Sequence, residues 1–256
     1  MDFFDSHAHY NDAKFNNNRK ELLEDIYSAG VTRILNAGYD LKSSEKAIQI
    51  AEENEFIVAS VGLSPHDLGS KDFVMELQGI EKLSKHEKVV AIGEIGLDYY
   101  WNKDNKELQK DVFMKQIELA NKLDLPIIIH NRDASSDVID VLKNKMPSKN
   151  KGVFHCCMLE KELVEEAIKL DYYISFAGPI TFKNTHNADE IINMVPLDRI
   201  VIETDSPYLS PEPYRGRTND SRNLKYIAEK IAEARNMSIE EIAETTSINA
   251  KKLFRT

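Results

Sequence analysis

Eight short apolar runs, separated by longer amphipathic stretches, occur along the whole chain. The runs lie at residues 3–4, 33–35, 56–59, 89–92, 126–129, 152–154, 172–174 and 199–202. Several of them are rich in Val and Ile and apolar at every position, which is typical of parallel strands buried on both faces. The sequence therefore predicts a set of buried strands spaced evenly along the chain.

The stretches between the runs have the periodicity of helices. We expect helices at residues 18–29, 44–54, 106–123, 135–145, 160–170 and 220–236. Ser238 and Glu241 have the spacing of a capping box, which predicts a last helix that ends near residue 253. Strands that alternate with helices predict an α/β fold, and the length of 256 residues favours a TIM-type (β/α)8 barrel as a single domain over residues 1–256. A doubly wound open sheet is the alternative.

The composition excludes several classes of protein. With 42% hydrophobic residues and no uncharged apolar stretch of about 18 residues, the chain is neither disordered nor expected to cross a membrane. The adjacent Cys156 and Cys157 favour reduced thiols in a cytoplasmic protein, and we expect Cys156 to point into the core. The formal net charge of -10 argues against a long basic track for duplex DNA. A nucleic-acid substrate would need a local positive site instead.

Residue types that bind metals follow several of the apolar runs. His7 and His9 are two residues apart, so in a strand their side chains lie on one face and can hold one ion. In a (β/α)8 barrel, residues at the carboxyl ends of the strands form the active site. Further residues of these types are found after later runs, at Glu94, His130, His155, Glu203 and Asp205. Glu203 and Asp205 share a face if the last strand continues past them.

These groups point to a two-ion metal centre. Buried together without cations, several imidazoles and carboxylates would have a heavy desolvation cost, which divalent ions remove. Nitrogen and oxygen ligands without a thiolate suit Zn, Mn, Ni, Co or Mg. The set exceeds what one ion with an open catalytic position needs, so we expect two divalent ions about 3.5–4 Å apart, with Glu94 as the shared ligand.

Short motifs recur in a fixed order along the chain. They are DSHAH at residues 5–9, AIGEIGLD at 91–98, LPIIIHNR at 125–132, FHC at 154–156, ETDSPYL at 203–209, PYRGRTN at 213–219 and NAKKLF at 249–254. In this order they resemble the TatD-type metal-dependent deoxyribonucleases, within the amidohydrolase-like barrels. One departure is Ser64, where the family commonly has the histidine of a His-Pro pair, while His66 is retained.

The resemblance implies a role for each ligand. It implies one metal held by His7, His9, Glu94 and Asp205, and a second held by Glu94, His130 and His155. In the mechanism we expect, Asp205 accepts the proton of the attacking water and Glu94 bridges the ions. Glu203 orients Asp205 or a ligand histidine, with a purely structural role as the alternative.

Substrate contacts are expected around this centre. The candidates are His66, Arg132, Tyr208, Arg215 and Arg217, each of which has an alternative as an ordinary loop or solvated residue. The arginines suit phosphate groups because they form bidentate contacts. Tyr99, Tyr100, Trp101 and Tyr208 are expected at the same end, where they either stack on unpaired bases or pack at the rim.

The sequence thus predicts a metal-dependent deoxyribonuclease that hydrolyses phosphodiester bonds in DNA. We expect a monomeric exonuclease that acts on single-stranded DNA or frayed ends. The alternative enzyme is an amidohydrolase-type ester or amide hydrolase, such as a D-aminoacyl-tRNA deacylase or a lactonase, because the same metal pair can attack a carbonyl. A third hypothesis is a barrel that binds a metal or a partner without catalysis.

Overall fold

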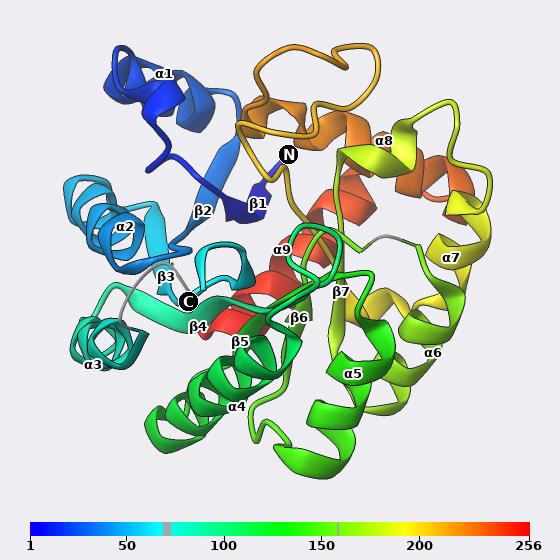
Figure 1. Ribbon diagram of the computed structural model, residues 1–256. Coiled ribbons are helices and arrows are strands. Elements are labelled where there is room, and N and C mark those ends of the chain that lie inside the picture. Colours follow the sequence, from blue (N-terminus) through cyan, green and yellow to red (C-terminus); the bar gives the residue numbers. More distant parts are fainter. Residues whose placement is uncertain (69–72, 158) are drawn as a thin grey trace.

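Each of the predicted apolar runs forms a strand, and the strands pair side by side in chain order in one parallel sheet. The computed structural model describes residues 1–68, 73–157 and 159–256 (Figure 1). The strands are β1 (Phe3–Ala8), β2 (Val31–Ala37), β3 (Ile57–Val61), β4 (Val89–Asp98), β5 (Ile127–Arg132), β6 (Gly152–Phe154), β7 (Tyr173–Phe176) and β8 (Ile200–Ile202).

Backbone hydrogen bonds between the first strand and the segment after the last one close the sheet into a barrel. The Asp205 amide donates to the His7 carbonyl oxygen at 2.9 Å, and the His9 amide donates to the Ser206 carbonyl oxygen at 2.7 Å. An open doubly wound sheet would leave both edges unpaired. The predicted (β/α)8 barrel is therefore confirmed, and the open-sheet alternative is excluded.

Helices alternate with the strands and form the outer ring (Figure 1). They are α1 (Arg19–Ser28), α2 (Leu41–Glu53), α3 (Phe73–Leu83), α4 (Lys106–Leu123), α5 (Ser135–Asp140), α6 (Lys161–Lys169), α7 (Ala188–Met194), α8 (Leu224–Arg235) and α9 (Ile239–Phe254). Helices α3 and α7 were not predicted from the sequence. Phe73, Leu77 and Ile80 in α3 do have helical spacing, whereas α7 is too short to give a clear periodic signal.

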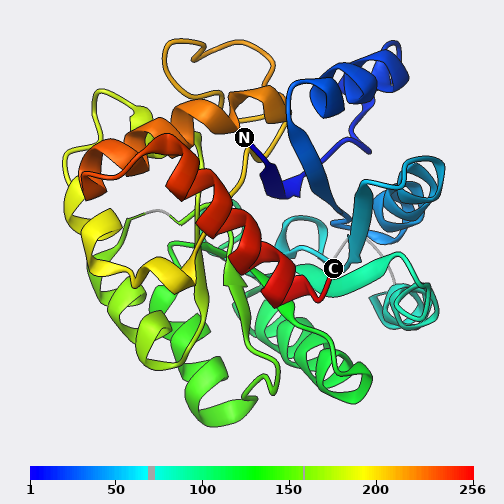
Figure 2. The same cartoon turned by 180° about the vertical axis from the view of Figure 1, so that it is seen from behind.

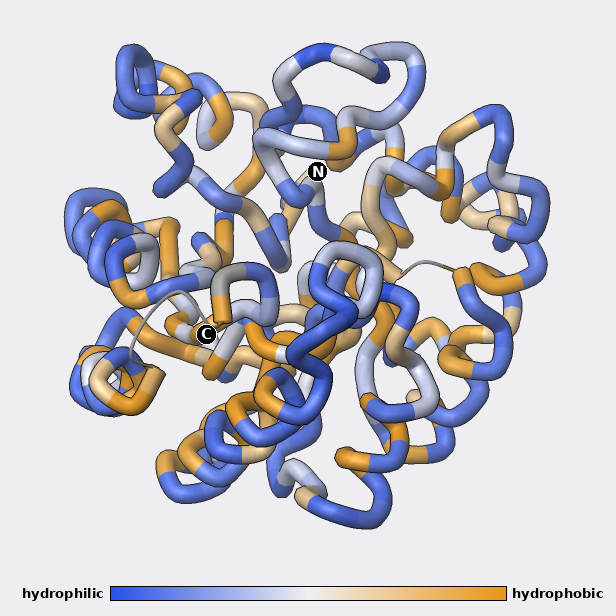
Figure 3. Tube along the Cα trace, viewed as in Figure 1, coloured by the Kyte–Doolittle hydropathy of each residue, from blue (hydrophilic) through white to orange (hydrophobic). Residues whose placement is uncertain are grey.

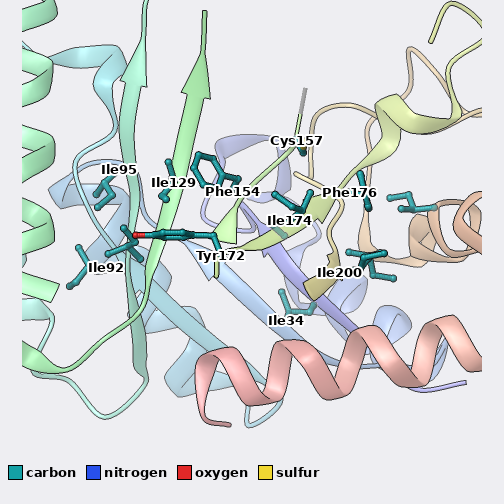
Figure 4. Packing of buried hydrophobic residues seen from close by; sticks show 14 of the residues in the cluster. Ile34, Ile92, Ile95, Ile129, Phe154, Cys157, Tyr172, Ile174, Phe176 and Ile200 are labelled. Carbon is teal, nitrogen blue, oxygen red and sulfur yellow. The ribbon is translucent and has the colours of Figure 1, made fainter. Parts of the chain in front are cut away.

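Alternation along the strands divides the core into two layers. Side chains such as Ile34, Ile92 and Ile129 point outward and pack against the helices, in what we call the strand–helix layer (Figure 4). The opposite faces of the strands fill the barrel interior, with Phe4, Leu35, Val58, Ala91, Ile128, Val153, Tyr173 and Val201. In Figure 3 the strands are largely hydrophobic, and the outer loops are mostly hydrophilic. Within the described residues no helix is long and apolar enough to cross a membrane.

The last helix closes one end of the barrel. Seen from behind, α9 crosses in front of the strands (Figure 2). Its residues Leu253 and Phe254 belong to the interior cluster, and the Phe254 ring lies 6.0 Å from that of Phe4. This end is opposite to the carboxyl ends of the strands, so α9 supports the interior without covering the site.

Strands β1 and β4 each carry a bulge that bears on the site. Between Asp5 and Ala8, β1 advances three residues while β2 advances two, and β4 does the same against β5 between Ile92 and Ile95. Ile92 and Ile95 therefore both point into the strand–helix layer, although unbroken alternation would place residues three apart on opposite faces. The strand is longer than the predicted apolar run 89–92, because β4 continues through the bulge to Asp98.

Removal of the Phe254 ring should destabilise the barrel. We expect Phe254→Ala to lower the free energy of unfolding by about 3–5 kcal/mol, because the ring is almost fully buried and leaves a cavity. Ile248→Ala is the matched control in the same helix, since that side chain is 55% exposed. Urea denaturation of both variants measures the difference, and equal losses would contradict the role of α9 as the barrel's closing element.

Candidate metal centre

The six predicted ligand side chains meet at the carboxyl end of the barrel. Strand alternation alone turns His130, His155 and Glu203 inward. Each of them lies two positions after a residue that faces the barrel interior, and residues two apart in a strand share a face. His7 and Glu94 instead lie within the bulged parts of β1 and β4. These bulges turn the two side chains toward the barrel axis, which is a common use of a bulge beside a functional site.

One half of the cluster surrounds the Oε2 atom of Glu94. The Nε2 atoms of His7 and His9 lie 3.1 Å apart, as expected for two residues on one strand face. Glu94 Oε2 is 3.5 Å from His7 Nε2 and 3.6 Å from His9 Nε2. Asp205 Oδ1 is 3.8 Å and 3.3 Å from the same two nitrogens. Four potential ligand atoms therefore face one another.

The other half of the cluster faces the Oε1 atom of Glu94. This oxygen lies 2.9 Å from His130 Nδ1 and 3.5 Å from His155 Nε2. The two ring nitrogens are 3.3 Å apart. Glu94 thus has one oxygen in each half of the cluster, which is the arrangement that a bridging carboxylate requires.

Hydrogen bonds at the rear of three rings suit them to bind a metal. His9 Nδ1 lies 3.0 Å from the Ala37 carbonyl oxygen, and His155 Nδ1 lies 3.2 Å from Glu203 Oε1. His130 uses the opposite nitrogen, with Nε2 at 3.0 Å from Asp98 Oδ2. Each acceptor fixes a proton on the rear nitrogen and leaves the lone pair of the other nitrogen facing Glu94. The donor set therefore fits divalent cations.

The charges in the cluster shift one another's pKa values. Burial alone raises the pKa of Glu94, but the charge of His155 and the hydrogen bond from His130 hold that pKa well below its usual range. Burial lowers the pKa of His155, and Glu94 and Glu203 reverse this effect, so the pKa of His155 lies well above its usual range. Protons on imidazoles and a divalent ion therefore compete for the same nitrogens.

Glu203 and Asp205 do not share a face. The strand β8 ends at Ile202, and Asp205 adopts a left-handed backbone conformation with φ of 55°. Glu203 is fully buried and its Oε1 accepts from the Cys156 amide at 2.8 Å as well as from His155. Asp205 faces the cluster through its contact with His9. Of the roles considered for Glu203, the geometry favours the orientation of His155.

Two buried carboxylates beside the cluster were not assigned from the sequence. The Asp98 carboxylate contacts two histidine rings, because its Oδ2 atom lies 3.0 Å from His130 Nε2 and 3.2 Å from His66 Nε2. Asp5 accepts from the Thr204 amide at 3.0 Å and from the Ser221 hydroxyl at 2.6 Å, and burial raises its pKa to about 7. Their position inside otherwise apolar strands could have identified these carboxylates in the sequence. An unpaired buried carboxylate costs free energy, so each of them requires partners nearby.

A cavity of about 570 Å³ opens beside the cluster. His130, His155 and Asp205 form its polar edge, and its apolar walls include Pro179, Phe182 and Leu209. The expectation for Cys156 is wrong, because this residue lines the cavity; it has φ of 43°, which breaks the alternation after β6. Both cysteines are free, as expected.

The predicted substrate-contact residues are distributed around this opening. Arg132 lines the cavity directly, and the Arg215 guanidinium lies 4.3 Å from the centre of the Phe182 ring on the cavity wall. His66 is partly exposed and its ring lies 4.9 Å from that of His130. Tyr208 lies at the other half of the histidine–carboxylate cluster, with its ring 6.5 Å from that of His9.

Arg217 is the exception among these residues. It is exposed in the loop after β8, and its guanidinium lies 5.5 Å from the Tyr214 ring. Neither Arg215 nor Arg217 is among the residues that line the cavity, but Arg215 contacts the wall residue Phe182, whereas Arg217 contacts Tyr214, which does not line it.

Comparison with known proteins identifies the family. The profile described as TatD related DNase matches residues 4–255. This chain belongs to the TatD-related DNase family. The predicted resemblance is thus confirmed over nearly the whole chain.

Relatives match along their full length. The chain is 46% identical to a Bacillus subtilis protein named uncharacterized metal-dependent hydrolase YabD, over 98% of each chain. It is 32% identical to the Escherichia coli protein named uncharacterized metal-dependent hydrolase YcfH, over 99% of this chain and 96% of that one. The crystal structure of YJJV, a TatD homologue from Escherichia coli, superposes with a TM-score of 0.93 at 27% identity, covering 99% of this chain and 98% of that one.

Divalent ions should stabilise the folded protein. We expect saturating Mn²⁺ or Zn²⁺, added to protein stripped with a chelator, to raise Tm by roughly 5–15 °C, because an ion that binds only the native state shifts the unfolding equilibrium. Differential scanning fluorimetry measures this shift. His86→Ala serves as the control, since His86 is remote from the cluster and pairs with Glu52. A Glu94→Gln variant should respond much less, and an equal response would argue against these ligands.

Proposed function

We propose that this protein is a divalent-metal-dependent hydrolase that cleaves phosphodiester bonds in DNA. Its expected substrate is single-stranded DNA or a frayed end, cut as an exonuclease. The observation that supports this most directly is the position of Glu94, which presents one oxygen to each half of a histidine–carboxylate cluster. Sites with two metals about 3.5–4 Å apart are typical of nucleases and phosphatases.

The ligand residues follow from the two halves of the cluster. We propose that His7, His9, Glu94 and Asp205 hold one ion and that Glu94, His130 and His155 hold the other. Mg, Mn, Zn, Ni and Co all suit this donor set. When bound, such ions lower the pKa of a water molecule and compensate the charge that develops on a phosphate.

Asp205 is the proposed proton acceptor. Its side chain is 14% exposed, compared with 6% for Glu94, and it lines the cavity where a substrate would enter. An attacking water there would transfer its proton to the free Asp205 oxygen. Glu203 is a positioning residue, because it contacts the rear nitrogen of His155 and does not face the cavity.

The cations around the opening support a phosphate-bearing substrate. Arg132 and Arg215 lie at the cavity and can form charge-assisted hydrogen bonds with phosphates next to the scissile one. His66 and Tyr208 would contact the substrate at opposite sides of the centre, and Arg217 would act further along the loop. These local charges offset the net charge of -10, which otherwise repels DNA.

A carbonyl substrate is the second candidate. The apolar walls formed by Pro179, Phe182 and Leu209 would also accept the acyl part of an ester. An amidohydrolase-type D-aminoacyl-tRNA deacylase or lactonase would use the same cluster. We favour DNA because the arginines at the opening match a phosphate chain better than a small neutral lactone.

We also propose that the protein is a monomer and that it is located in the cytoplasm.

Loss of one ligand should strongly reduce hydrolysis. We expect His130→Ala and Glu94→Gln to reduce kcat/KM on labelled single-stranded DNA by on the order of 10²–10³-fold, because each removes transition-state charge stabilisation. Glu203→Gln should have a smaller effect, about 10–100-fold, since it acts only by holding His155. His86→Ala is the control with unchanged activity.

The same metal-loaded protein should be tested with four substrates. These are single-stranded DNA, an abasic duplex, a D-aminoacyl-tRNA and a lactone. We expect turnover of DNA that is lost on chelation and regained with Mn²⁺. Hydrolysis of the tRNA ester or the lactone, with DNA left intact, would replace the nuclease by the carbonyl hydrolase.

Arg215 should affect binding more than turnover. We expect Arg215→Ala to raise KM for single-stranded DNA about three- to fivefold at low salt with little change in kcat, since an exposed contact with phosphate is weak and screened. Lys143→Ala makes the same change in net charge on the outer face, where Lys143 pairs with Glu166, and should leave KM unchanged. Steady-state kinetics at two salt concentrations measure both effects. A lower kcat at constant KM would place Arg215 in the chemical step instead.

A further inference from the structure

We propose that Tyr100 and Trp101 form a stacking platform for an unpaired base of the DNA strand that enters the centre. The inference rests on the proposed nuclease function and assigns a binding site to one loop, between β4 and α4. The Tyr100 side chain is 49% exposed and that of Trp101 is 63% exposed. Their rings meet edge to face, with centres 4.9 Å apart and planes at 88°. This contact leaves much of the indole surface accessible.

The platform is attached directly to the centre. Asp98 Oδ1 accepts hydrogen bonds from the backbone amides of both Tyr100 and Trp101, each at 2.9 Å. The second oxygen of the same carboxylate lies 3.0 Å from His130 Nε2. One buried side chain therefore places the aromatic pair next to a residue of the cluster. A base on the platform would bring its own phosphate backbone to the opening of the cavity.

The loop that carries the platform is held rigidly. Gln109 is fully buried, and its side-chain amide donates to the Asp98 carbonyl at 3.0 Å and to the Asn102 carbonyl at 2.9 Å. From the other side, the side chains of Asn102 and Asn105 donate to backbone carbonyls of the segment after β3. A preformed platform loses little conformational entropy on binding, which favours affinity.

A cation completes the site. The Arg132 guanidinium lies 3.9 Å from the centre of the Tyr100 ring and 5.6 Å from that of Trp101. Arg132 also lines the cavity beside the cluster. Aromatic side chains next to an arginine are the usual means of binding single strands, because every base has a flat face and every nucleotide has a phosphate. In a duplex the bases are paired and stacked on one another, so the platform favours unpaired DNA.

The other aromatic side chains at this end are occupied. Tyr99 is buried and its hydroxyl donates to Asp137 at 2.6 Å. The Tyr208 hydroxyl donates to Asp12 at 2.8 Å, and its ring lies near His9 rather than beside the cavity residue Arg132. Of the four aromatic residues that the sequence places near the centre, Tyr100 and Trp101 are therefore the pair suited to bind a base.

The chain contains one tryptophan and ten tyrosines, so emission excited at the long-wavelength edge, where tyrosine absorbs little, reports on this loop. Metal-loaded protein is titrated with a single-stranded phosphorothioate oligonucleotide, which resists hydrolysis, and with the blunt duplex of the same sequence. We expect saturable quenching of the Trp101 emission by the single strand and little change with the duplex. Equal quenching by both would overturn the preference for an unpaired base.

Variants separate stacking from other effects. Anisotropy of a fluorescein-labelled single strand should show a Kd about tenfold higher for Trp101→Ala and close to wild type for Trp101→Phe, which keeps a flat ring. Tyr27→Ala is the control, because Tyr27 is 54% exposed in α1 and packs on Phe56 away from the centre. Thermal unfolding of each variant verifies that the fold is intact.

The outcomes distinguish this proposal from the nuclease proposal. If the protein binds and cleaves single-stranded DNA while Trp101→Ala has the wild-type Kd and Trp101 emission does not change, the platform is refuted and the nuclease stands. If the metal-loaded protein neither binds nor cleaves any DNA, both fail. Tight binding of single strands with quenching, but cleavage only of a carbonyl substrate, would support the platform and refute the nuclease.

Discussion

The contact of Glu94 with four imidazoles is the interaction on which the arrangement of this barrel depends. Its two oxygens lie between 2.9 and 3.6 Å from ring nitrogens of His7, His9, His130 and His155. A carboxylate at this depth is stable only with cations around it, whether protons on the rings or metal ions. The bulge in β4 serves this contact, because without it the Glu94 side chain would point outward into the strand–helix layer. The hydrogen bonds behind the rings then hold each imidazole in place for the same carboxylate.

Much of this arrangement could be read from the sequence. Every apolar run became a strand, because parallel strands buried on both faces leave a strong and local signal. The side chains that we predicted as ligands also lie together, since residues such as His130 and His155 follow inward-facing residues of their strands by two positions. The carboxyl ends of all strands in such a barrel lie at one face, and this rule was sufficient to predict that side chains from five separate segments lie close together.

The features that could not be predicted depend either on contacts between distant segments or on irregular backbone just after a strand. The inward turn of Glu94 requires a change of register against β5, which periodicity within β4 does not reveal. The divergence of Glu203 and Asp205 follows from the early end of β8, and the exposure of Cys156 to the cavity follows from a left-handed residue after β6. Asp98 was visible in the motif, but its role depends on two histidines from other strands.

The seam of the barrel has a consequence for protein synthesis. His7 lies in the first strand and His9 directly after it, and their backbone pairs with that of Asp205 and Ser206 after the last strand. A ribosome adding about 5–20 residues per second needs roughly 10–40 s to translate the chain from His9 to Asp205. During that time the nascent chain lacks the Asp205 carboxylate and cannot complete the histidine–carboxylate cluster. A centre divided in this way stays incomplete until translation has passed the last strand, so partial chains beside the messenger remain without the proposed activity.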